Sequence, residues 1–253
     1  MKITFLGTGT SQGIPVIGNS HPVCLSQNPK DKRLRVSVFI EWNDNAYVID
    51  CGPDFRRQML NVKATKIDGI LFTHEHADHT AGIDDIRPFF FKQGDIPVYA
   101  HERVLKSLHK RFDYIFESEN KYPGAPGVKE HEIINAPFFL KDLKVIPING
   151  FHNKLQVFGF RFGDFAYLTD MKTIHDDEIA KIKGIDIVVI NALREKPHLS
   201  HFNLEEALEF IKKVNPKKAY LTHISHLLGF HDAVQQRLPK NVFLAYDGLV
   251  INL

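Results

Sequence analysis

The stretch from Gly69 to His79 reads Gly-Ile-Leu-Phe-Thr-His-Glu-His-Ala-Asp-His. Its first part, up to Thr73, is an apolar run of the kind that forms a buried strand, and a polar cluster begins directly after it at His74. A strand that ends in this way holds the next residues at the rim of a sheet, where several side chains can converge. Imidazole and carboxylate groups are typical ligands of zinc, manganese and iron. The stretch therefore predicts a metal site.

The spacing within this cluster favours two ions rather than one. His74 and His76 are two residues apart and can share one ion. Asp78 and His79 lie on the other side of the turn and can reach a second. A pair of metal ions needs about three protein ligands per ion and preferably a bridging oxygen donor. More ligands are therefore expected elsewhere in the chain.

Three further donors stand where predicted strands end. They are His152, beyond the run 143–148, Asp170, directly after the run 165–169, and His223, directly after the run 219–222. Strand ends at one edge of a sheet are a natural meeting place for functional side chains. With the first cluster, these donors make a candidate set of seven metal ligands.

The remaining pattern indicates a mixed α/β fold. The predicted strands cover 2–6, 36–42, 46–50, 69–73, 96–100, 143–148, 156–162, 165–169, 185–191, 219–222 and 242–251, and the predicted helices cover about 53–61, 102–112, 174–183, 203–214 and 231–237. The clearest helix is 203–214, which has Asn203 as its N-cap and Asn215-Pro216 at its end. Two β-rich halves, each with helices, suggest a four-layer sandwich with paired sheets inside and helices outside.

Length and composition are those of an ordinary globular protein. The chain has 253 residues, 43% of them hydrophobic and 25% charged, so we expect one domain over 1–253. The 32 basic and 30 acidic residues are interspersed, without a basic block for nucleic acid or an anionic membrane. The sequence has no leader pattern, no apolar run long enough to span a bilayer and only two cysteines. We therefore expect a cytoplasmic protein.

The segment 117–130 is the best candidate for a mobile loop. It holds Pro123, Gly124, Pro126 and Gly127, which interrupt regular structure. The pattern predicts either a lid over a site or an inert surface connection, and it favours neither.

The metal cluster, together with His152 and the motifs Leu168-Thr-Asp170 and Leu221-Thr-His223, resembles the metallo-β-lactamase superfamily. The resemblance covers essentially the whole chain and implies an αββα sandwich. It also implies a ligand assignment, in which His74, His76 and His152 hold one ion, Asp78, His79 and His223 hold the other, and Asp170 bridges the two. True β-lactamases differ, because their pattern has a cysteine near the bridging position. Flavodiiron oxidoreductases differ as well, because they carry Glu where His76 stands.

Three segments, Gly7–Pro15, Leu221–His226 and Tyr246–Gly248, are most similar to one branch of this superfamily. The branch is typified by the cyclic phosphodiesterase of the carbon–phosphorus lyase pathway for phosphonates. In that branch a histidine before an Asp/Asn-Leu pair, here His201, contacts the phosphate and assists the leaving group. An imidazolium can neutralise phosphate and donate a proton, an effect of about 10²–10⁴-fold. His198 competes for the same role.

The resemblance also assigns a supporting role to Asp50. The residue stands in Ile49-Asp-Cys-Gly52, which matches a buried aspartate that supports the histidine loop in the family. A carboxylate in that position orients an imidazole ligand and raises its basicity. The alternative is an ordinary turn aspartate before a glycine.

Some members of the same branch hold a third, structural zinc with three cysteines and a histidine. The matching positions here are Asn19, His21 and Cys24, with His226 as the histidine. Three zinc-type donors, His21, Cys24 and His226, thus stand where four are normal for a closed zinc site. Either another ligand completes this site or the site is lost.

Together these features predict a metal-dependent hydrolase with two divalent ions, zinc or manganese. The predicted substrate is a small cyclic or nucleotide-like phosphodiester. Water activated by the two ions attacks phosphorus, His201 serves the leaving group, and Asp78 is counted with the catalytic residues as well as with the ligands. The expected partner is therefore a small molecule, and the resemblance alone allows a homodimer.

Three other functions stay open. A tRNA 3′-processing endonuclease of the same fold would need a basic, flexible arm to grip tRNA phosphates, whereas 117–130 is short and mixed in charge. A lactone or thioester hydrolase would use the same activated water on a carbonyl. A metal-binding scaffold would retain the fold without catalysis, but the completeness of the ligand set argues against it.

Overall fold

The computed structural model describes residues 1–117 and 121–253. The chain forms two compact units that are interleaved in the sequence. Unit 1 comprises Met1–Gly7, Arg35–Ile133 and Gly248–Leu253, and unit 2 comprises Thr8–Leu34 and Ile134–Asp247. The expectation of a single domain over 1–253 stays a prediction.

Unit 1 is built on a seven-stranded sheet with the order β14-β1-β2-β3-β4-β5-β6. Its strands are β1 (Lys2–Gly7), β2 (Ser37–Trp42), β3 (Asn45–Ile49), β4 (Gly69–Leu71), β5 (Ile96–Ala100), β6 (Val128–Glu132) and β14 (Val250–Asn252). Pairing is antiparallel from β14 to β3 and parallel from β3 to β6. The β2–β3 hairpin turns at Asn43 and Asp44, whose φ angles of 42° and 60° suit residue types that tolerate the left-handed region.

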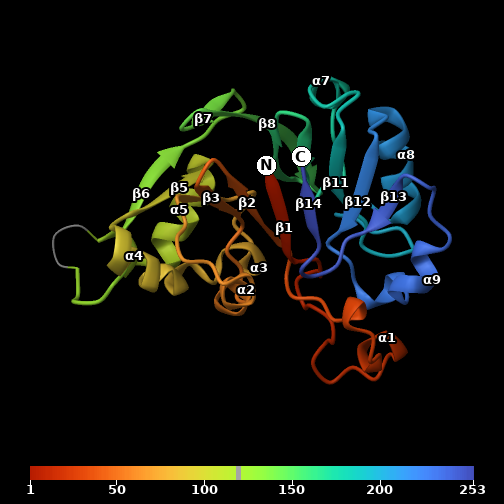
Figure 1. The fold of residues 1–253 in the computed structure, drawn as a ribbon, viewed down its shortest axis with the longest axis horizontal. Coiled ribbons are helices and arrows are strands. Elements are labelled where there is room, and N and C mark those ends of the chain that lie inside the picture. Colours follow the sequence, from red (N-terminus) through yellow and green to blue (C-terminus); the bar gives the residue numbers. More distant parts are fainter. Residues whose placement is uncertain (118–120) are drawn as a thin grey trace. The chain divides into compact units, whose positions relative to one another are not determined.

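The parallel part of this sheet is connected through helices, as parallel strands require. The helices of unit 1 are α2 (Phe55–Val62), α3 (Ala77–Thr80), α4 (Arg87–Gln93), α5 (Glu102–Arg111) and α6 (Asp113–Phe116), with a 3₁₀ turn, η2, over Ile83–Ile86. Figure 1 shows α4 and α5 beside the strands β5 and β6. Fully buried side chains such as Phe55, Ile70 and Val98 join helices and sheet in one apolar core.

The two ends of the chain close unit 1. The strand β14 pairs with β1, and the Met1 amino group donates a hydrogen bond of 2.7 Å to the Leu253 carbonyl. In Figure 1 the two termini accordingly lie side by side.

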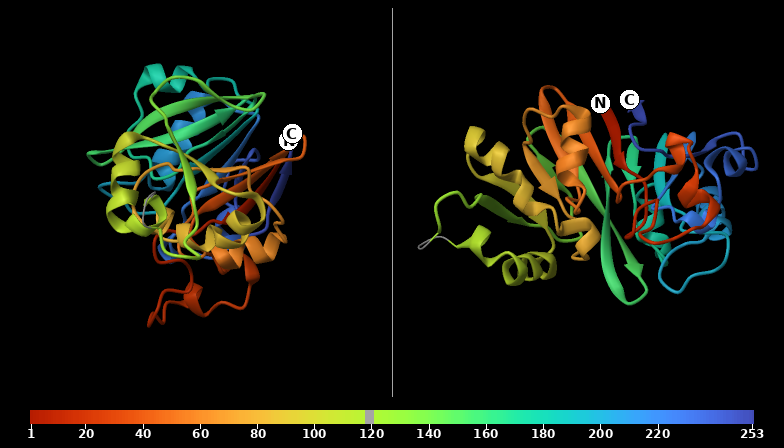
Figure 2. Two further views of the ribbon diagram at one scale, coloured as in Figure 1. Left: turned by 90° about the vertical axis from the view of Figure 1, so that its left-hand side faces the viewer. Right: turned by 90° about the horizontal axis from the view of Figure 1, so that it is seen from below.

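Unit 2 repeats the same plan in a second seven-stranded sheet, with the order β13-β12-β11-β10-β9-β8-β7. Its strands are β7 (Phe138–Leu140), β8 (Leu143–His152), β9 (Leu155–Phe162), β10 (Phe165–Tyr167), β11 (Ile187–Asn191), β12 (Lys218–Thr222) and β13 (Val242–Leu244). Pairing is antiparallel from β7 to β10 and parallel from β10 to β13. Figure 2 shows β8 and β9 as a long pair of green and teal strands.

Unit 2 also contains helices. They are α1 (Pro22–Leu25), α7 (Asp176–Ala180), α8 (Leu204–Val214) and α9 (His231–Gln235), with 3₁₀ turns η1 (Pro29–Asp31) and η3 (His226–Leu228). The predicted helix 203–214 is confirmed as α8. Asn203 caps its N-terminus in a capping box with Glu206, and Asn215 ends it in the left-handed conformation. The α/β class predicted from the sequence is confirmed in both units.

The structure also corrects several predicted elements. The single strand predicted over 242–251 is wrong, because β13 pairs with β12 in unit 2 whereas β14 pairs with β1 in unit 1. The strand predicted over 143–148 continues to His152, because β8 stays paired with β9 along that length. Helices α3, α4 and α6 were not predicted, since short helices carry too little periodicity to detect.

Part of the predicted loop 117–130 is regular structure. Residues 128–130 belong to β6, which pairs in parallel with β5, and residues 118–120 lie outside the described part of the chain. A lid function for this segment stays a prediction. Within the ranges that the structure describes, no helix is both long enough and apolar enough to cross a bilayer.

The capping of α8 gives a direct test of this fold. Asn203 is buried, its side-chain oxygen accepts the Glu206 amide at 3.0 Å, and its amide group donates to the Glu195 carbonyl at 2.9 Å. We expect Asn203→Ala to lower the free energy of unfolding by about 1 kcal/mol or somewhat more, because it removes an N-cap. Urea unfolding measures this effect. Glu205→Ala, in the same turn but exposed, is the control, and equal losses in both variants would contradict the assignment.

Candidate metal centre

The histidine motif of unit 1, residues 74–79, follows β4. The segment after β3 is hydrogen-bonded to this motif. The Phe72 amide still pairs with the Tyr99 carbonyl at 2.9 Å, and the chain then crosses the rim of the sheet into the short helix α3. The Cys51 amide donates to the carbonyl of His79 at 2.7 Å. A Cβ atom at Gly52 would stand 2.0 Å from the Asp78 carbonyl oxygen, so this close approach requires glycine.

Asp50 is the centre of the hydrogen bonding beneath this motif. It directly follows β3, is fully buried and has a left-handed backbone with φ of 63°. Its carboxylate accepts the Thr73 amide at 2.9 Å and the Thr73 hydroxyl at 2.8 Å, and it lies 2.7 Å from Nδ1 of His79. Burial raises the pKa of Asp50, and His79 and Thr73 oppose that rise. These contacts are the ones that a supporting role for Asp50 requires.

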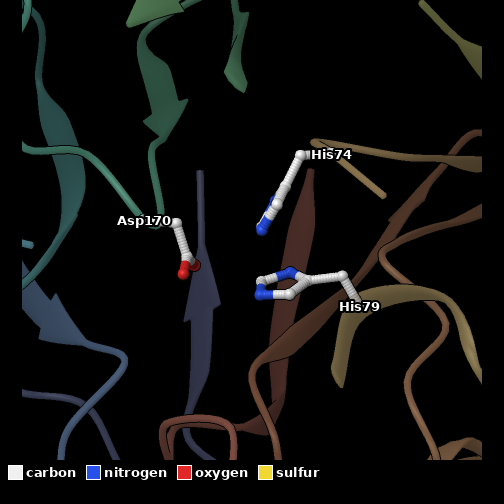
Figure 3. A group of neighbouring side chains, drawn as sticks. All are labelled: His74, His79 and Asp170. Carbon is white, nitrogen blue, oxygen red and sulfur yellow. The ribbon is translucent and has the colours of Figure 1, made fainter. Parts of the chain in front are cut away.

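The side chains above Asp50 converge. Nε2 of His74 lies 3.0 Å from Nδ1 of His76, and the rings of His74 and His79 are 4.2 Å apart between centroids. Nε2 of His79 lies 3.3 Å from a carboxylate oxygen of Asp78. Figure 3 shows the rings of His74 and His79, and it also draws Asp170 of unit 2. Unit 1 therefore brings together all four donors predicted from its motif.

Unit 2 gathers the other predicted residues at the ends of its strands. His152 is the last residue of β8, Asp170 follows β10, and His223 directly follows β12. His201 precedes α8. Asp170 and His223 have left-handed backbones, with φ of 57° and 53°, although neither is glycine. Such conformations cost about 1–3 kcal/mol each and cluster at functional sites, where the surrounding structure enforces them.

These residues of unit 2 are close enough to share an ion. A carboxylate oxygen of Asp170 lies 3.2 Å from Nε2 of His223 and 3.6 Å from Nδ1 of His201. Between ring centroids, His201 stacks on His223 at 4.7 Å and is tilted against His152 at 4.3 Å. Donor atoms of His152, Asp170 and His201 all lie within 4.8 Å of one another. His201, predicted for catalysis, is thus also placed as a potential ligand.

The environment of His201 also revises its predicted charge. Burial, followed by the neighbouring His223, lowers the pKa of His201 to about 2. The buried Nδ1 atom has no hydrogen-bond partner among the described residues. A neutral ring is the form that binds a metal ion, whereas the sequence suggested an imidazolium.

The donor chemistry fits divalent metal ions. Metal-binding imidazoles usually have one nitrogen held by a second group, which leaves the other nitrogen for the ion. Here Nδ1 of His79 faces Asp50 at 2.7 Å, Nδ1 of His152 faces the Ser200 carbonyl at 2.6 Å, and Nδ1 of His74 faces the Thr73 hydroxyl at 3.0 Å. The buried His/Asp clusters of both units are therefore consistent with a metal site.

Sequence reasoning missed several of these supporting groups. The carbonyl of Ser200 carries no sequence signal, because every residue has one. Asn191, at the end of β11, accepts the Met171 amide at 2.7 Å and donates to its carbonyl at 2.9 Å, which fixes the loop that carries Asp170. An asparagine directly after four apolar strand residues was the available signal for this role.

The residues of the predicted structural metal site are joined by hydrogen bonds and do not form a compact group of donors. The amide of Asn19 lies 3.3 Å from Nε2 of His226, and its oxygen accepts the His21 amide at 2.8 Å. Nδ1 of His21 accepts the Val23 amide at 3.3 Å. Among the described residues, His21, Cys24 and His226 do not form a donor group within 4.8 Å. Hydrogen bonds through Asn19 thus hold this segment, and a third metal stays a prediction.

Comparisons with known proteins agree with this geometry. A family model described as a beta-lactamase superfamily domain matches residues 45–224. A crystal structure described as a new diphosphatase from the PhnP family is 38% identical, with a TM-score of 0.93, and the match covers 100% of this chain and 97% of that one.

Two curated relatives have other names. A Porphyromonas gingivalis protein named octanoyltransferase is 38% identical over 252 residues, which are 98% of this chain and 51% of that protein. This chain therefore spans about half the length of that relative. A ribonuclease Z of Methanococcus maripaludis is 32% identical over 113 residues, which are 43% of this chain and 32% of that protein.

The hydrogen bond between Asp50 and His79 generates a prediction about metal affinity. Asp50→Asn keeps the shape of the side chain but removes the negative charge that orients and polarises the His79 ring. We expect the affinity for zinc or manganese to fall about 10- to 100-fold, measured by competition with a chelator. Asp84→Asn is the control, since Asp84 pairs with Arg87 through a partly exposed ion pair in the same unit. Unchanged affinity in a folded Asp50→Asn protein would contradict the role of this carboxylate.

Proposed function

Since the chain belongs to the metallo-β-lactamase superfamily, we propose that it hydrolyses a small cyclic or nucleotide-like phosphodiester with two divalent metal ions. The metallo-β-lactamase fold and a metal-dependent hydrolase activity are the features that this chain shares with its relatives. The observation that carries the proposal is the pair of partly buried His/Asp clusters, one in each unit, that follow strands and are supported by hydrogen bonds. The 38% identity with a PhnP-family diphosphatase over the full chain favours a phosphorus centre as the target.

The proposed ligand assignment keeps all seven predicted residues. His74, His76 and His152 would hold one ion, Asp78, His79 and His223 would hold the other, and Asp170 would bridge them. Support comes from the local geometry within each unit, in particular the 3.0 Å approach of His74 to His76 and the 3.2 Å approach of Asp170 to His223. Mixed nitrogen and oxygen ligands suit both zinc and manganese.

Two such ions, when bound, supply a strongly acidified water and polarise the oxygens of the phosphate. The chain itself supplies orientation. Asp50 and the Ser200 carbonyl hold Nδ1 of His79 and His152, so that Nε2 of each ring stays available.

His201 is proposed to act at the leaving group. Its buried ring is neutral without substrate. The negative charge of a phosphodiester beside the ring raises the pKa of that ring and favours its protonated form. His201 can then give its proton to the departing alkoxide.

A second candidate, thioester hydrolysis, is favoured by one relative only. The Porphyromonas gingivalis protein is named an octanoyltransferase, and activated water at a dinuclear site can also attack an acyl carbonyl. That relative is about twice as long as this chain, so its name does not locate the acyl chemistry in the shared half. A tRNA-processing endonuclease and a metal-binding scaffold are the remaining alternatives.

A substrate panel separates these functions. Protein reconstituted with manganese or zinc would be given 2′,3′-cyclic nucleotides, a bis-aryl phosphodiester, an octanoyl thioester, a lactone and pre-tRNA. We expect turnover of the phosphodiesters and little turnover of the acyl substrates. Preference for the thioester would replace the proposed function with acyl hydrolysis. Absence of any turnover with both metals bound would favour a scaffold.

Two histidine variants separate metal binding from catalysis. We expect His76→Ala to lose bound metal and turnover together, because it removes a ligand. We expect His201→Ala to keep its metal content and to lose turnover about 10²- to 10⁴-fold, as the loss of a general acid predicts. Elemental analysis of each variant accompanies the kinetics. A metal-replete His201→Ala with normal turnover would remove this residue from the mechanism.

A further inference from the structure

The loop between β11 and α8 in unit 2 is held by several hydrogen bonds although it lies partly at the surface. The Arg194 guanidinium donates to the carbonyls of Lys196 at 3.1 Å and Pro197 at 2.8 Å. The Ser200 carbonyl lies 2.6 Å from Nδ1 of His152. This loop therefore holds the residues between Arg194 and Ser200 in fixed positions beside a candidate metal ligand.

His198 lies within this loop, and its own hydrogen bonds fix its tautomer. Nδ1 accepts the Ser200 amide at 3.3 Å and lies 3.2 Å from the Ser200 hydroxyl. A backbone amide can only donate, so Nδ1 is an acceptor and the ring proton of neutral His198 sits on Nε2. Within unit 2, Nε2 has no hydrogen-bond partner. The ring thus offers one oriented N–H donor.

The His198 ring, which carries this donor, lies beside the candidate site residues of unit 2. The His198 ring lies 5.2 Å from the His201 ring, which stacks in turn near His152 and His223. His201 is only 8% exposed, whereas His198 is partly exposed, so His198 forms the accessible end of this row of imidazoles.

The charges around His198 favour an anion. Burial is the largest cause that lowers the pKa of His198. Arg194, His152 and Lys172 lower this pKa further through their positive charges. The cation within the loop, Arg194, attracts a negatively charged ligand, whereas the Lys172 ammonium is paired with Glu206 at 2.6 Å. A phosphate oxygen meets both conditions, since it is negative and accepts a hydrogen bond, whereas a thioester carbonyl is neutral.

We propose that His198 is a further substrate-binding residue, whose Nε2–H donates a hydrogen bond to a nonbridging phosphate oxygen while His201 serves the leaving group. This inference rests on the proposed function, because it takes a phosphodiester as the substrate. It assigns His198 to binding rather than to proton transfer, since the Ser200 amide donates to Nδ1 and leaves Nε2–H as the donor.

Three substitutions test the assignment, because amide side chains can mimic either ring nitrogen. The amide nitrogen of Gln lies near the position of Nε2, and that of Asn lies near Nδ1. We expect His198→Ala to raise KM about 10- to 100-fold, because one hydrogen bond to a charged group is lost. We expect kcat and the metal content to change little. His198→Gln restores most of the affinity and His198→Asn does not. A fall in kcat at constant KM, or equal behaviour of Gln and Asn, would overturn the assignment.

His175→Gln is the matched control for these variants. His175 is an exposed histidine of unit 2 that stands at the N-terminus of α7 without a capping hydrogen bond. We expect its substitution to leave KM unchanged. An equal rise in KM for His175→Gln would show that the effect is not specific to His198.

A direct measurement keeps the inference separate from the proposed function. Inorganic phosphate is titrated into the zinc-loaded protein, and the imidazole nitrogens are followed by ¹⁵N NMR, with His198→Gln used to assign the signal. We expect the Nε2 resonance of His198 to shift with phosphate while Nδ1 remains an acceptor. An unmoved His198 signal at saturating phosphate contradicts the inference even if phosphodiesters are hydrolysed. A shifted signal supports phosphate binding at His198 even if no phosphodiester in the panel is cleaved, a result that would count against the proposed function alone.

Discussion

The carboxylate of Asp50 is the constraint on which the histidine motif depends. A buried carboxylate is costly unless donors surround it, and Asp50 meets this requirement with the amide and hydroxyl of Thr73 and with the ring of His79. These donors come from the end of β4 and from α3, so one charge ties three separate segments together. The left-handed backbone of Asp50 and the missing Cβ of Gly52 allow the chain to turn beneath the motif.

In unit 2, different residues hold the segments that follow the strands. Asp170 and His223 also adopt left-handed conformations directly after strands, and the surrounding hydrogen bonds hold them there. Asn191 binds both backbone groups of Met171 and so fixes the turn after Asp170, while the amide of Ile224 donates to the Thr8 carbonyl after His223. In both units the strain sits at the ends of the parallel strands, where rigid sheet structure can enforce it. A left-handed residue directly after a strand, Asp50 in unit 1 and Asp170 and His223 in unit 2, is thus a shared feature of the two halves of the chain.

Ser200 connects the candidate ligand His152 with His198. Its carbonyl holds His152, and its amide and hydroxyl hold His198. Because Ser200 contacts Nδ1 of both rings, the same short segment leaves Nε2 of His152 available as a candidate ligand and Nε2 of His198 as a donor. Burial is the main cause of the lowered pKa of His201, which lies between them.

The sequence by itself determined the α/β class, most strands and the candidate set of donor residues. Those features are local: an apolar run followed by His, Asp and His depends only on neighbouring residues, and the N-cap of α8 lies within one turn of the chain. The tertiary structure decided what depends on distant partners. It divided the stretch 242–251 between two sheets, brought His201 within reach of Asp170, and placed the carbonyl of Ser200 against His152. A backbone carbonyl is identical at every position, and left-handed ligands look like any other aspartate or histidine, so only the folded chain shows which of them the site uses.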